Sequence, residues 1–172
     1  MAETIVYYTS SPVKGEKNRR NLRELEAVCM RAVTESRNDD GLYPYSSKSH
    51  SQGNAVIAVS RYPVGCDMEA MPCGRDVFNI LKGLFFFTDK DEADSIMESE
   101  DPARAAITAW TERECAYKAC GSRSRKDARD LSGMKFESIY TREGFVITCC
   151  VRQGSRISWV RVPLQQGAGI KL

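Results

Sequence analysis

Three carboxylates and a lysine, in two short segments, are the residues of this 172-residue chain whose types and spacing could do chemistry. The first segment reads Gly65-Cys66-Asp67-Met68-Glu69. On a strand, residues two apart point to the same face, so Asp67 and Glu69 stand side by side about 7 Å apart. Two carboxylates this close repel unless a cation or a basic group lies between them. The pair therefore indicates a cation site or, as the plainer alternative, a solvated face.

The second segment runs from Trp110 to Lys118 and reads Trp-Thr-Glu-Arg-Glu-Cys-Ala-Tyr-Lys. On a helix, residues four apart share a face, so Trp110, Glu114 and Lys118 form one stripe. If Glu114 joins Asp67 and Glu69, the three oxygen donors suit Mg²⁺, which takes a few carboxylates plus substrate phosphates. Taken singly, Glu114 and Lys118 also fit a surface ion pair and Trp110 fits a core position. Spacing alone indicates a candidate magnesium site in an α+β protein.

The elements that must position these segments mix strands and helices. β-Branched, aromatic or buried apolar runs predict strands at 4–9, 54–60, 64–69, 135–140, 144–151 and 156–162. The turn Arg61-Tyr62-Pro63 predicts that 54–60 pairs with 64–69. Apolar residues at helical spacing predict helices at 19–36, 75–86 and 89–100, and from Pro102 to about Cys120, ending at Gly121.

Composition favours a folded, water-soluble class of protein. Hydrophobic residues make up 42% and charged residues 28%, which argues against a disordered chain. No apolar run reaches transmembrane length, and the N-terminus lacks the pattern of a signal peptide, so we expect a cytoplasmic location and no membrane partner. Two basic clusters occur, at 14–23 and 123–129, but the net charge is only +2 and no interleaved aromatic motif accompanies them, which argues against a nucleic-acid-binding module.

Seven cysteines stand at spacings that form no recognisable disulfide framework, and their number is odd. They are Cys29, Cys66, Cys73, Cys115, Cys120, Cys149 and Cys150. No Cys-x-x-Cys pair occurs and His50 is the single histidine, so a zinc site would need ligands from distant segments. The pattern favours free, mostly buried thiols.

Together the motifs are more specific than their parts. Gly-x-Asp-x-Glu at 65–69, followed by Trp-Thr-x-x-Glu-x-x-x-Lys at 110–118, resembles the signature of the 4′-phosphopantetheinyl transferase superfamily. Ser49-His50-Ser51 is similar to the Ser-His-Ser element of its Sfp-type branch. Phe86-Phe87-Thr88 lies where that branch has Phe-Phe-Ser-x-x-Glu. The resemblance runs from about Gly41 to Gly121 and extends more weakly to Val162.

This resemblance implies an α+β fold of two similar α+β lobes with pseudo-twofold symmetry, with coenzyme A (CoA) in the cleft between them. We expect a shortened N-terminal lobe at 1–62, a C-terminal lobe with the magnesium and catalytic motifs at 63–162, and a flexible tail at 163–172. A chain with two similar lobes is expected to be a monomer, a pseudo-dimer in which the two lobes take the place of two subunits.

The implied activity is Mg²⁺-dependent transfer of the 4′-phosphopantetheine group of CoA to a serine of an acyl or peptidyl carrier protein. By resemblance, Asp67, Glu69 and Glu114 hold the magnesium, Glu114 and Lys118 are catalytic, and Ser49, His50 and Lys118 contact CoA, with Arg19, Arg20 and Arg23 as further candidates. The chain departs from the family pattern at Gly41-Leu42-Tyr43-Pro44, which lacks the lysine of Gly-Lys-Pro. The alternative is therefore a catalytically impaired CoA- or carrier-binding protein.

Overall fold

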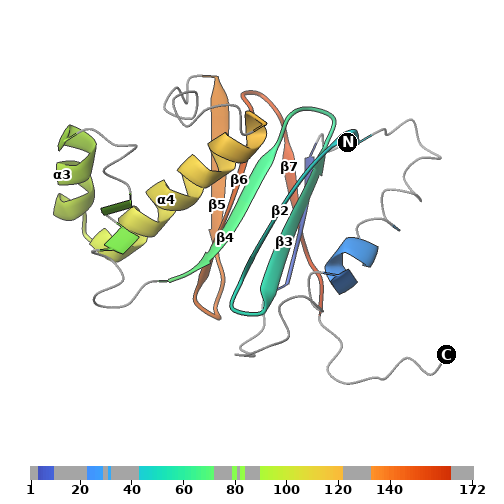
Figure 1. Cartoon of the computed structure of the whole chain (residues 1–172), viewed down its shortest axis with the longest axis horizontal. Helices are drawn as coiled ribbons and strands as arrows, with labels where there is room; N and C mark the ends of the chain where they lie inside the picture. Colours follow the sequence, from blue (N-terminus) through green and yellow to red (C-terminus); the bar gives the residue numbers. More distant parts are fainter. Residues whose placement is uncertain are drawn as a thin grey trace.

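The structure, a computed structural model, describes residues 4–9, 23–28, 31, 43–71, 79–80, 82–83, 90–121 and 133–163. Its strands are β1 (Thr4–Tyr8), β2 (Tyr45–Ser51), β3 (Asn54–Ser60), β4 (Gly65–Ala70), β5 (Met134–Tyr140), β6 (Phe145–Arg152) and β7 (Ile157–Arg161). Helices α3 (Lys90–Glu98) and α4 (Pro102–Ala119) lie between β4 and β5, and helical residues also occur at 23–28, 31, 79–80 and 82–83. The predicted mixed α+β class is confirmed (Figure 1).

The strands form two sheets, with the orders β2-β3-β1-β7 and β4-β6-β5. β3 lies between β1 and β2 just as β6 lies between β4 and β5, and all four of these pairings are antiparallel. β7 pairs in parallel with β1, so a strand from the second half of the chain completes the first sheet. The strand predicted at 54–60 is confirmed as β3 with those bounds.

The main hydrophobic core lies between the inner faces of the two sheets. Val6, Val56, Cys66 and Ile147, one from each of β1, β3, β4 and β6, are fully or almost fully buried in one cluster. Side chains alternate along a strand, so neighbouring residues face outward. On the first sheet these outward residues form a second cluster with Leu25, which is 1% exposed. The sheets are therefore stacked, and each outer face carries a helical cover (Figure 1).

The predicted pairing of 54–60 with 64–69 is wrong. β3 pairs with β1 and β2, whereas β4 pairs with β6, from Gly65 opposite Cys150 to Ala70 opposite Phe145. Every residue of β3 is buried, as expected for a strand with neighbours on both sides and layers on both faces. The turn at 61–63 consequently carries the chain from one sheet to the other, and Val56 and Cys66 meet across the core instead of along a hairpin.

Helix α4 begins and ends where the sequence predicts. The Asp101 side chain accepts a hydrogen bond from the Arg104 N–H at 3.0 Å, and Pro102 occupies the first turn, where a missing N–H has no cost. Gly121 has a φ of +70°, the left-handed conformation that terminates many helices. In the described ranges, no helix combines the length and the apolar character that crossing a membrane requires.

Five of the seven cysteines lie in the described residues, and all five are free thiols. Cys66, Cys115, Cys149 and Cys150 are buried, and burial raises the pKa of each thiol, that of Cys66 to about 11. A thiol that stays protonated at neutral pH is a poor nucleophile. These cysteines therefore act as packing residues, as predicted, while Cys29 and Cys73 lie outside the described residues.

Candidate active site

A stripe of serines on β2 faces the edge of β4 and joins the two sheets. Ser47, Ser49 and Ser51 lie two residues apart, so their side chains point to one side of β2. The Ser47 Oγ accepts a hydrogen bond from the Cys66 N–H at 3.0 Å. The Ser49 Oγ donates to Asp67 Oδ1 at 2.7 Å, and the Ser51 Oγ donates to Glu69 Oε2 at 3.2 Å. We call Ser47, Ser49 and Ser51 the serine stripe; it explains why β2 is a strand despite its polar sequence.

Asp67 is the most deeply buried carboxylate of this edge, with 3% of the residue exposed. Its Oδ1 accepts hydrogen bonds from Ser49 and from the Lys118 Nζ, each at 2.7 Å. Lys118 Nζ also donates to the Cys66 carbonyl at 3.1 Å. Oδ2 of Asp67 is buried and has no hydrogen-bond partner within the described part of the chain. A buried, unpartnered carboxylate oxygen is costly, so this atom is suited to a cation or a donor that a ligand brings.

The glycine before this carboxylate allows α4 to lie directly on β4. A Cβ built on Gly65 would lie 1.8 Å from the Cys115 carbonyl oxygen, a backbone atom that cannot move away on its own. A glycine in a strand lets another backbone or a ligand come close, and here the backbone of α4 makes that approach. This contact sets the height of α4 above the sheet, and therefore the distance from Lys118 to Asp67.

Buried hydroxyls fix the rotation of α4 over the same sheet. The Thr111 and Thr148 Oγ1 atoms are 2.7 Å apart, and Ser138 Oγ lies 2.9 Å from Thr148 Oγ1. Thr148 stands opposite Asp67 in the β4–β6 register and opposite Ser138 in the β5–β6 register. Cys115 Sγ donates to the Thr148 carbonyl at 3.2 Å. This polar row holds the face of α4 that carries Thr111, Cys115 and Lys118 against β4 and β6.

Trp110 fixes the other end of the motif through an apolar cluster. It packs with Ile96 of α3, and a Cβ on Gly83 would lie 2.7 Å from the Trp110 ring. The Arg113 Nη2 adds an ion pair with Glu92, because this one nitrogen donates to both carboxylate oxygens, at 3.0 and 2.8 Å. The stripe predicted for α4 therefore has an apolar anchor at Trp110, toward α3, and its charged end at Lys118, toward β4.

The ionisable side chains at the β2–β4 edge shift one another's pKa values. Burial, and next the Asp67 negative charge, raise the pKa of Glu69 from 4.5 to about 7; Glu114 adds to this effect, and Ser51 and Lys118 oppose it. Burial alone would lower the pKa of Lys118, yet the Asp67 charge and hydrogen bond hold it above 10.5. The three carboxylates thus act on one another, and one ammonium only partly neutralises them.

The donor set fits Mg²⁺ in chemistry. Carboxylate oxygens are the ligands this cation prefers, and Oδ2 of Asp67 has no hydrogen-bond partner among the residues that the structure describes. Within the described ranges, however, no three or more His, Cys, Asp or Glu side chains are already gathered to hold a metal ion. Asp67 and Glu69 lie on the same strand face and Glu114 lies within electrostatic reach. The prediction that these three residues bind magnesium remains a prediction.

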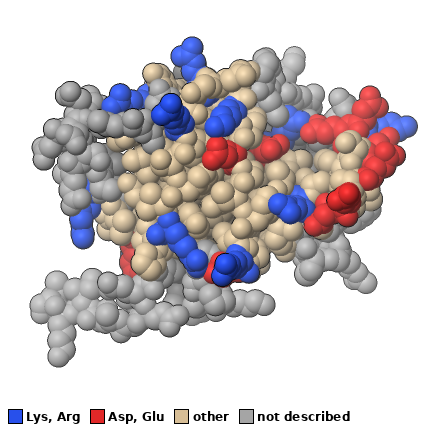
Figure 2. Space-filling model, turned by 180° about the vertical axis from the view of Figure 1, so that it is seen from behind, with Lys and Arg blue, Asp and Glu red and all other residues tan. Residues whose placement is uncertain are grey.

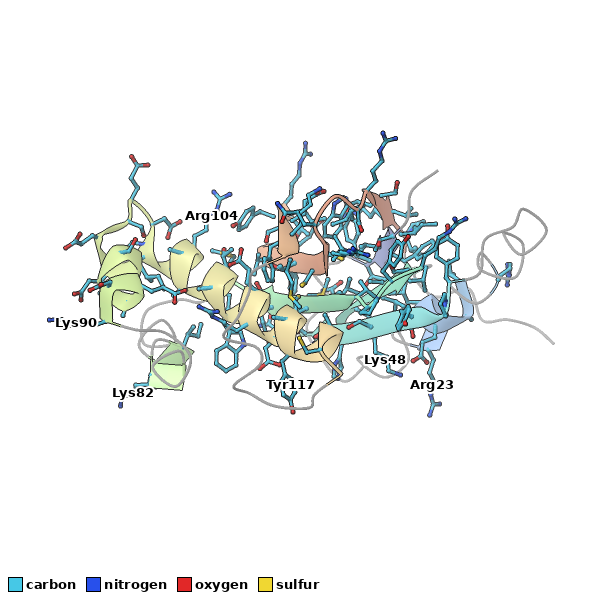
Figure 3. All side chains as sticks on the ribbon, turned by 90° about the horizontal axis from the view of Figure 1, so that it is seen from above. Arg23, Lys48, Lys82, Lys90, Arg104 and Tyr117 are labelled. Atoms are coloured by element: carbon cyan, nitrogen blue, oxygen red, sulfur yellow. The ribbon has the colours of Figure 1, made fainter. Side chains whose placement is uncertain are left out.

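The other residues predicted to bind CoA are divided between two faces. Ser49 lies with the carboxylates, whereas His50 lies on the opposite face of β2 and is exposed. Arg23 is exposed on the helical segment that covers the first sheet, and Lys48 of β2 forms an ion pair with Glu26 there. Arg23, Lys48 and Tyr117 project toward the same side of the molecule (Figure 3). Arg19 and Arg20 lie outside the described residues.

Sequence reasoning missed the parts that hold the site together. The sequence motifs include Ser51 only as a neighbour of Ser49 and Thr111 only as a motif residue, and they do not include Ser47. A signal was present: Ser47, Ser49 and Ser51 recur with the period of a strand, which predicts one hydroxyl-bearing face. The partner of that face could not be read from the chain, because it lies on a strand of the other sheet.

Acidic side chains gather at the end of the molecule formed by α3, away from β2 (Figure 2). Asp91, Glu92, Asp94 and Glu98 belong to this helix, and Glu100 and Asp101 follow it. An acidic partner would be repelled at this end. The basic segment at 123–129, whose charge makes it a candidate contact for an acidic carrier protein, lies outside the described residues.

Comparison with known families agrees with the motifs. The family described as the 4′-phosphopantetheinyl transferase superfamily matches residues 63–167, more than half of the chain. The match includes β4 and α4, with Asp67, Glu69, Glu114 and Lys118, but begins after Ser49 and His50. A search of curated proteins finds no match. On the strength of the family match, this chain belongs to the 4′-phosphopantetheinyl transferase superfamily.

Proposed function

We propose that the protein transfers the 4′-phosphopantetheine group of CoA to a serine of an apo acyl or peptidyl carrier protein, with Mg²⁺, and releases 3′,5′-ADP. Membership of the superfamily implies a transferase that places phosphopantetheine on carrier proteins. The observation that carries the finer proposal is Asp67: it is buried, its Oδ1 pairs with Lys118, and no described residue donates a hydrogen bond to its Oδ2. A phosphate-and-metal site requires such a charge-rich, shielded position.

The reaction is a phosphoryl transfer. The serine oxygen forms a bond to the phosphorus that carries the pantetheine arm, the bridging P–O bond of the pyrophosphate breaks, and 3′,5′-ADP leaves with the electron pair. The proton of the serine hydroxyl must be removed by a base. The barrier is mainly one of positioning and charge, which is what a rigid site between two sheets and a helix supplies.

Each residue of the site has a role in this scheme. Glu114 is half-buried, whereas its neighbour Cys115 is fully buried. In this scheme Glu114 takes the serine proton. Lys118 supplies a positive charge beside the cluster, where it can stabilise the departing phosphate. Asp67, Glu69 and Glu114 would hold Mg²⁺, which when bound neutralises charge on the pyrophosphate oxygens. Ser49 and Ser51 orient the two carboxylates of β4 by hydrogen bonds.

Two matching lobes are part of the proposal. In each half, a first strand is followed by helical residues and two further strands, and the third strand lies in the middle. This common order supports lobes related by pseudo-twofold symmetry, a CoA site at their junction and a monomer that acts as a pseudo-dimer. The Ser49-His50-Ser51 element supports placement in the Sfp-type branch, in the first lobe and outside the family match.

One observation favours a second candidate, a CoA- or carrier-binding protein with impaired catalysis. Lys118 already neutralises Asp67 at 2.7 Å, so the charge that a magnesium ion would balance is partly balanced within the chain. In this alternative the lysine replaces the cation permanently. The transferase proposal requires instead that the ion pair gives way, or rearranges, when substrate and Mg²⁺ bind.

Intact-mass analysis separates the two. Apo carrier proteins of the fatty-acid, polyketide and peptide types are incubated with the protein, CoA and Mg²⁺, with and without EDTA. We expect a phosphopantetheine mass gain that is lost with EDTA and in Glu114→Gln, but retained in Glu98→Gln, an amide substitution at an exposed position of α3. No gain on any carrier, while calorimetry detects CoA binding, would support the binding protein.

A further inference from the structure

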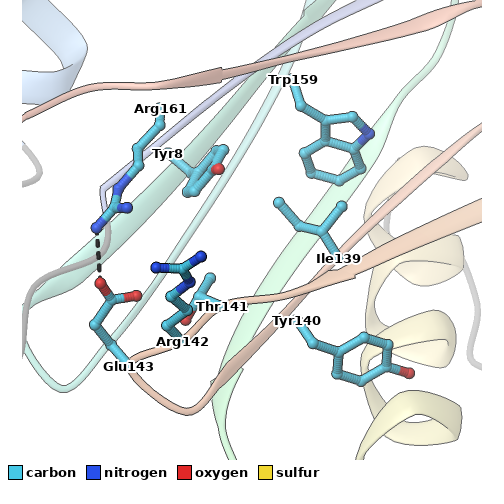
Figure 4. A pocket seen from close by; sticks show the side chains of 8 residues that line it. All are labelled: Tyr8, Ile139, Tyr140, Thr141, Arg142, Glu143, Trp159 and Arg161. Carbon is cyan, nitrogen blue, oxygen red and sulfur yellow. Dashed lines mark hydrogen bonds and ion pairs between the residues drawn. The ribbon is translucent and has the colours of Figure 1, made fainter.

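A cavity lies between β5 and β7, at the edge of the stacked sheets opposite the serine stripe (Figure 4). Its volume is about 300 Å³. The walls come from β1 at Tyr8, β5 at Ile139 and Tyr140, the turn at 141–143, and β7 at Trp159 and Arg161. None of these residues belongs to the candidate active site, and the cavity has no part in the proposed transfer.

The floor of this cavity is apolar and ordered. The Tyr8 and Trp159 rings meet edge to face, with centroids 6.4 Å apart, and Ile139 lies across from them. Trp159 uses its only polar group outside the cavity, because its Nε1–H donates to Glu137 Oε1 at 2.7 Å. The ring therefore offers the cavity only apolar surface, suited to a small hydrocarbon or aromatic group.

The rim carries an excess of positive charge. Arg161 pairs with Glu143 at 2.7 Å, on the rim of the cavity. No carboxylate of the described residues forms an ion pair with Arg142. In Figure 4 the Arg142 guanidinium lies between the Arg161–Glu143 pair and Ile139. A guanidinium is a rigid fork of donors that matches a carboxylate or a phosphate in two hydrogen bonds.

The turn that presents Arg142 is held by several hydrogen bonds. The Gly144 N–H donates to the Thr141 carbonyl at 3.1 Å, and the Thr141 N–H donates to the Phe145 carbonyl at 2.9 Å. Tyr140 is fixed to α4, since its hydroxyl lies 2.8 Å from Thr108 Oγ1 and the Arg104 guanidinium lies 3.6 Å from its ring centroid. A preformed site loses little entropy when it binds a ligand.

We infer that this cavity binds a small organic anion, with an apolar body on Tyr8 and Trp159 and one carboxylate or phosphate group on Arg142. The volume lies at the lower limit of known ligand pockets, which suits a short or single-ring acid and is too small for CoA. Arg161 adds charge, partly offset by Glu143. The site is thus a second ligand site, separate from the transfer site.

Nuclear magnetic resonance of the full chain tests this with four probes: benzoate, phenyl phosphate, inorganic phosphate and benzyl alcohol. The Trp159 indole N–H reports on the cavity, and the Trp110 indole N–H, in the α3–α4 cluster, is the internal control. We expect benzoate or phenyl phosphate to shift the Trp159 signal, and the tighter of the two identifies the head group. Benzyl alcohol and inorganic phosphate, each lacking one half of the recognised structure, should bind about tenfold more weakly.

Matched arginine variants locate the anion. Arg142→Gln should weaken the binding about tenfold, whereas Arg152→Gln, at the exposed end of β6, should leave it unchanged. An unaltered spectrum of unliganded Arg142→Gln verifies that the cavity is still folded. The inference is overturned if no probe shifts Trp159 selectively, if benzyl alcohol binds as tightly as benzoate, or if the two variants bind alike.

Discussion

The two edges of the stacked sheets are closed by different chemistry. At the β2–β4 edge, the serine stripe and Lys118 surround two carboxylates that are buried or half-buried. At the β5–β7 edge, Trp159 and Arg161 bond to Glu137 and Glu143. The pKa of Glu69 is raised to about 7, chiefly by burial and then by Asp67. The pKa of Glu137 is lowered, because the Trp159 and Lys135 hydrogen bonds outweigh its slight burial.

This contrast teaches where the protein holds unfavourable charge. Donors at the β5–β7 edge stabilise the ionised form of the carboxylates they contact. At the β2–β4 edge, carboxylates destabilise one another, and Asp67 Oδ2 lacks a partner in the described part of the chain. Strained electrostatics of that kind are typical of functional sites, where a substrate or cation completes the set.

The largest expected effect comes from breaking the close contact under α4. Gly65→Ala would place a Cβ against the Cys115 carbonyl, so α4 must move away from β4. We expect the free energy of unfolding to fall by about 3 kcal/mol and transfer to be lost. Gly154→Ala is the control: there the Cβ meets no atom of the described residues, but φ is +90°, which costs about 1–2 kcal/mol by strain alone. Equal losses, by urea denaturation, would show that the contact does not position α4.

Replacing one positively charged side chain at each edge by methionine sharpens the comparison. Lys118→Met leaves Asp67 buried and without its ammonium, so we expect a loss of about 3 kcal/mol in the free energy of unfolding. Arg161→Met removes a more exposed ion pair and should cost less than about 1 kcal/mol. Adding Mg²⁺ should restore stability to Lys118→Met alone. If both variants lose the same amount, the edges do not differ as described.

The raised pKa of Glu69 predicts a pH dependence in the metal-free protein. The folded state binds this proton more tightly than the unfolded chain, so the stabilisation is present in full below pH 4.5 and is lost as the pH rises to about 7. Denaturation across pH 4–8 should show this decline, and Glu69→Gln should flatten it. Glu137→Gln should not, since the pKa of Glu137 is shifted downward. A decline that persists in Glu69→Gln would assign it to another group.

The smallest effect concerns the serine stripe. Ser51→Ala removes the hydrogen bond that lowers the pKa of Glu69, so that pKa should rise further, and stability should fall by about 1 kcal/mol. Ser158→Ala, at an exposed position of β7, should change neither quantity. Titration of the carboxyl carbon by nuclear magnetic resonance measures the pKa of Glu69. An unchanged pKa in Ser51→Ala would contradict the role assigned to the serine stripe.

Sequence alone predicted the elements whose signals are local. β3 is a continuous apolar run, and α4 begins at an Asp-Pro pair and ends before a glycine, so their bounds follow from neighbouring residues. The carboxylate motif and the α4 stripe follow from strand and helix periodicity. Strand pairing was not local. β4 pairs with β6, some eighty residues later, whereas the turn at 61–63, between β3 and β4, gave a misleading hairpin signal. The ion pair between Lys118 and Asp67 likewise depends on the close approach of α4 to β4 at Gly65, which the sequence does not reveal.

The most direct measurement makes the same chemical change at both edges, Asp67→Asn and Glu143→Gln, and follows phosphopantetheine transfer to an apo carrier protein by intact mass. If the β2–β4 edge is the active site, Asp67→Asn should lose transfer while Glu143→Gln retains the wild-type rate. Transfer that survives in Asp67→Asn, with CoA and Mg²⁺ present, would contradict the assignment of the active site to this edge.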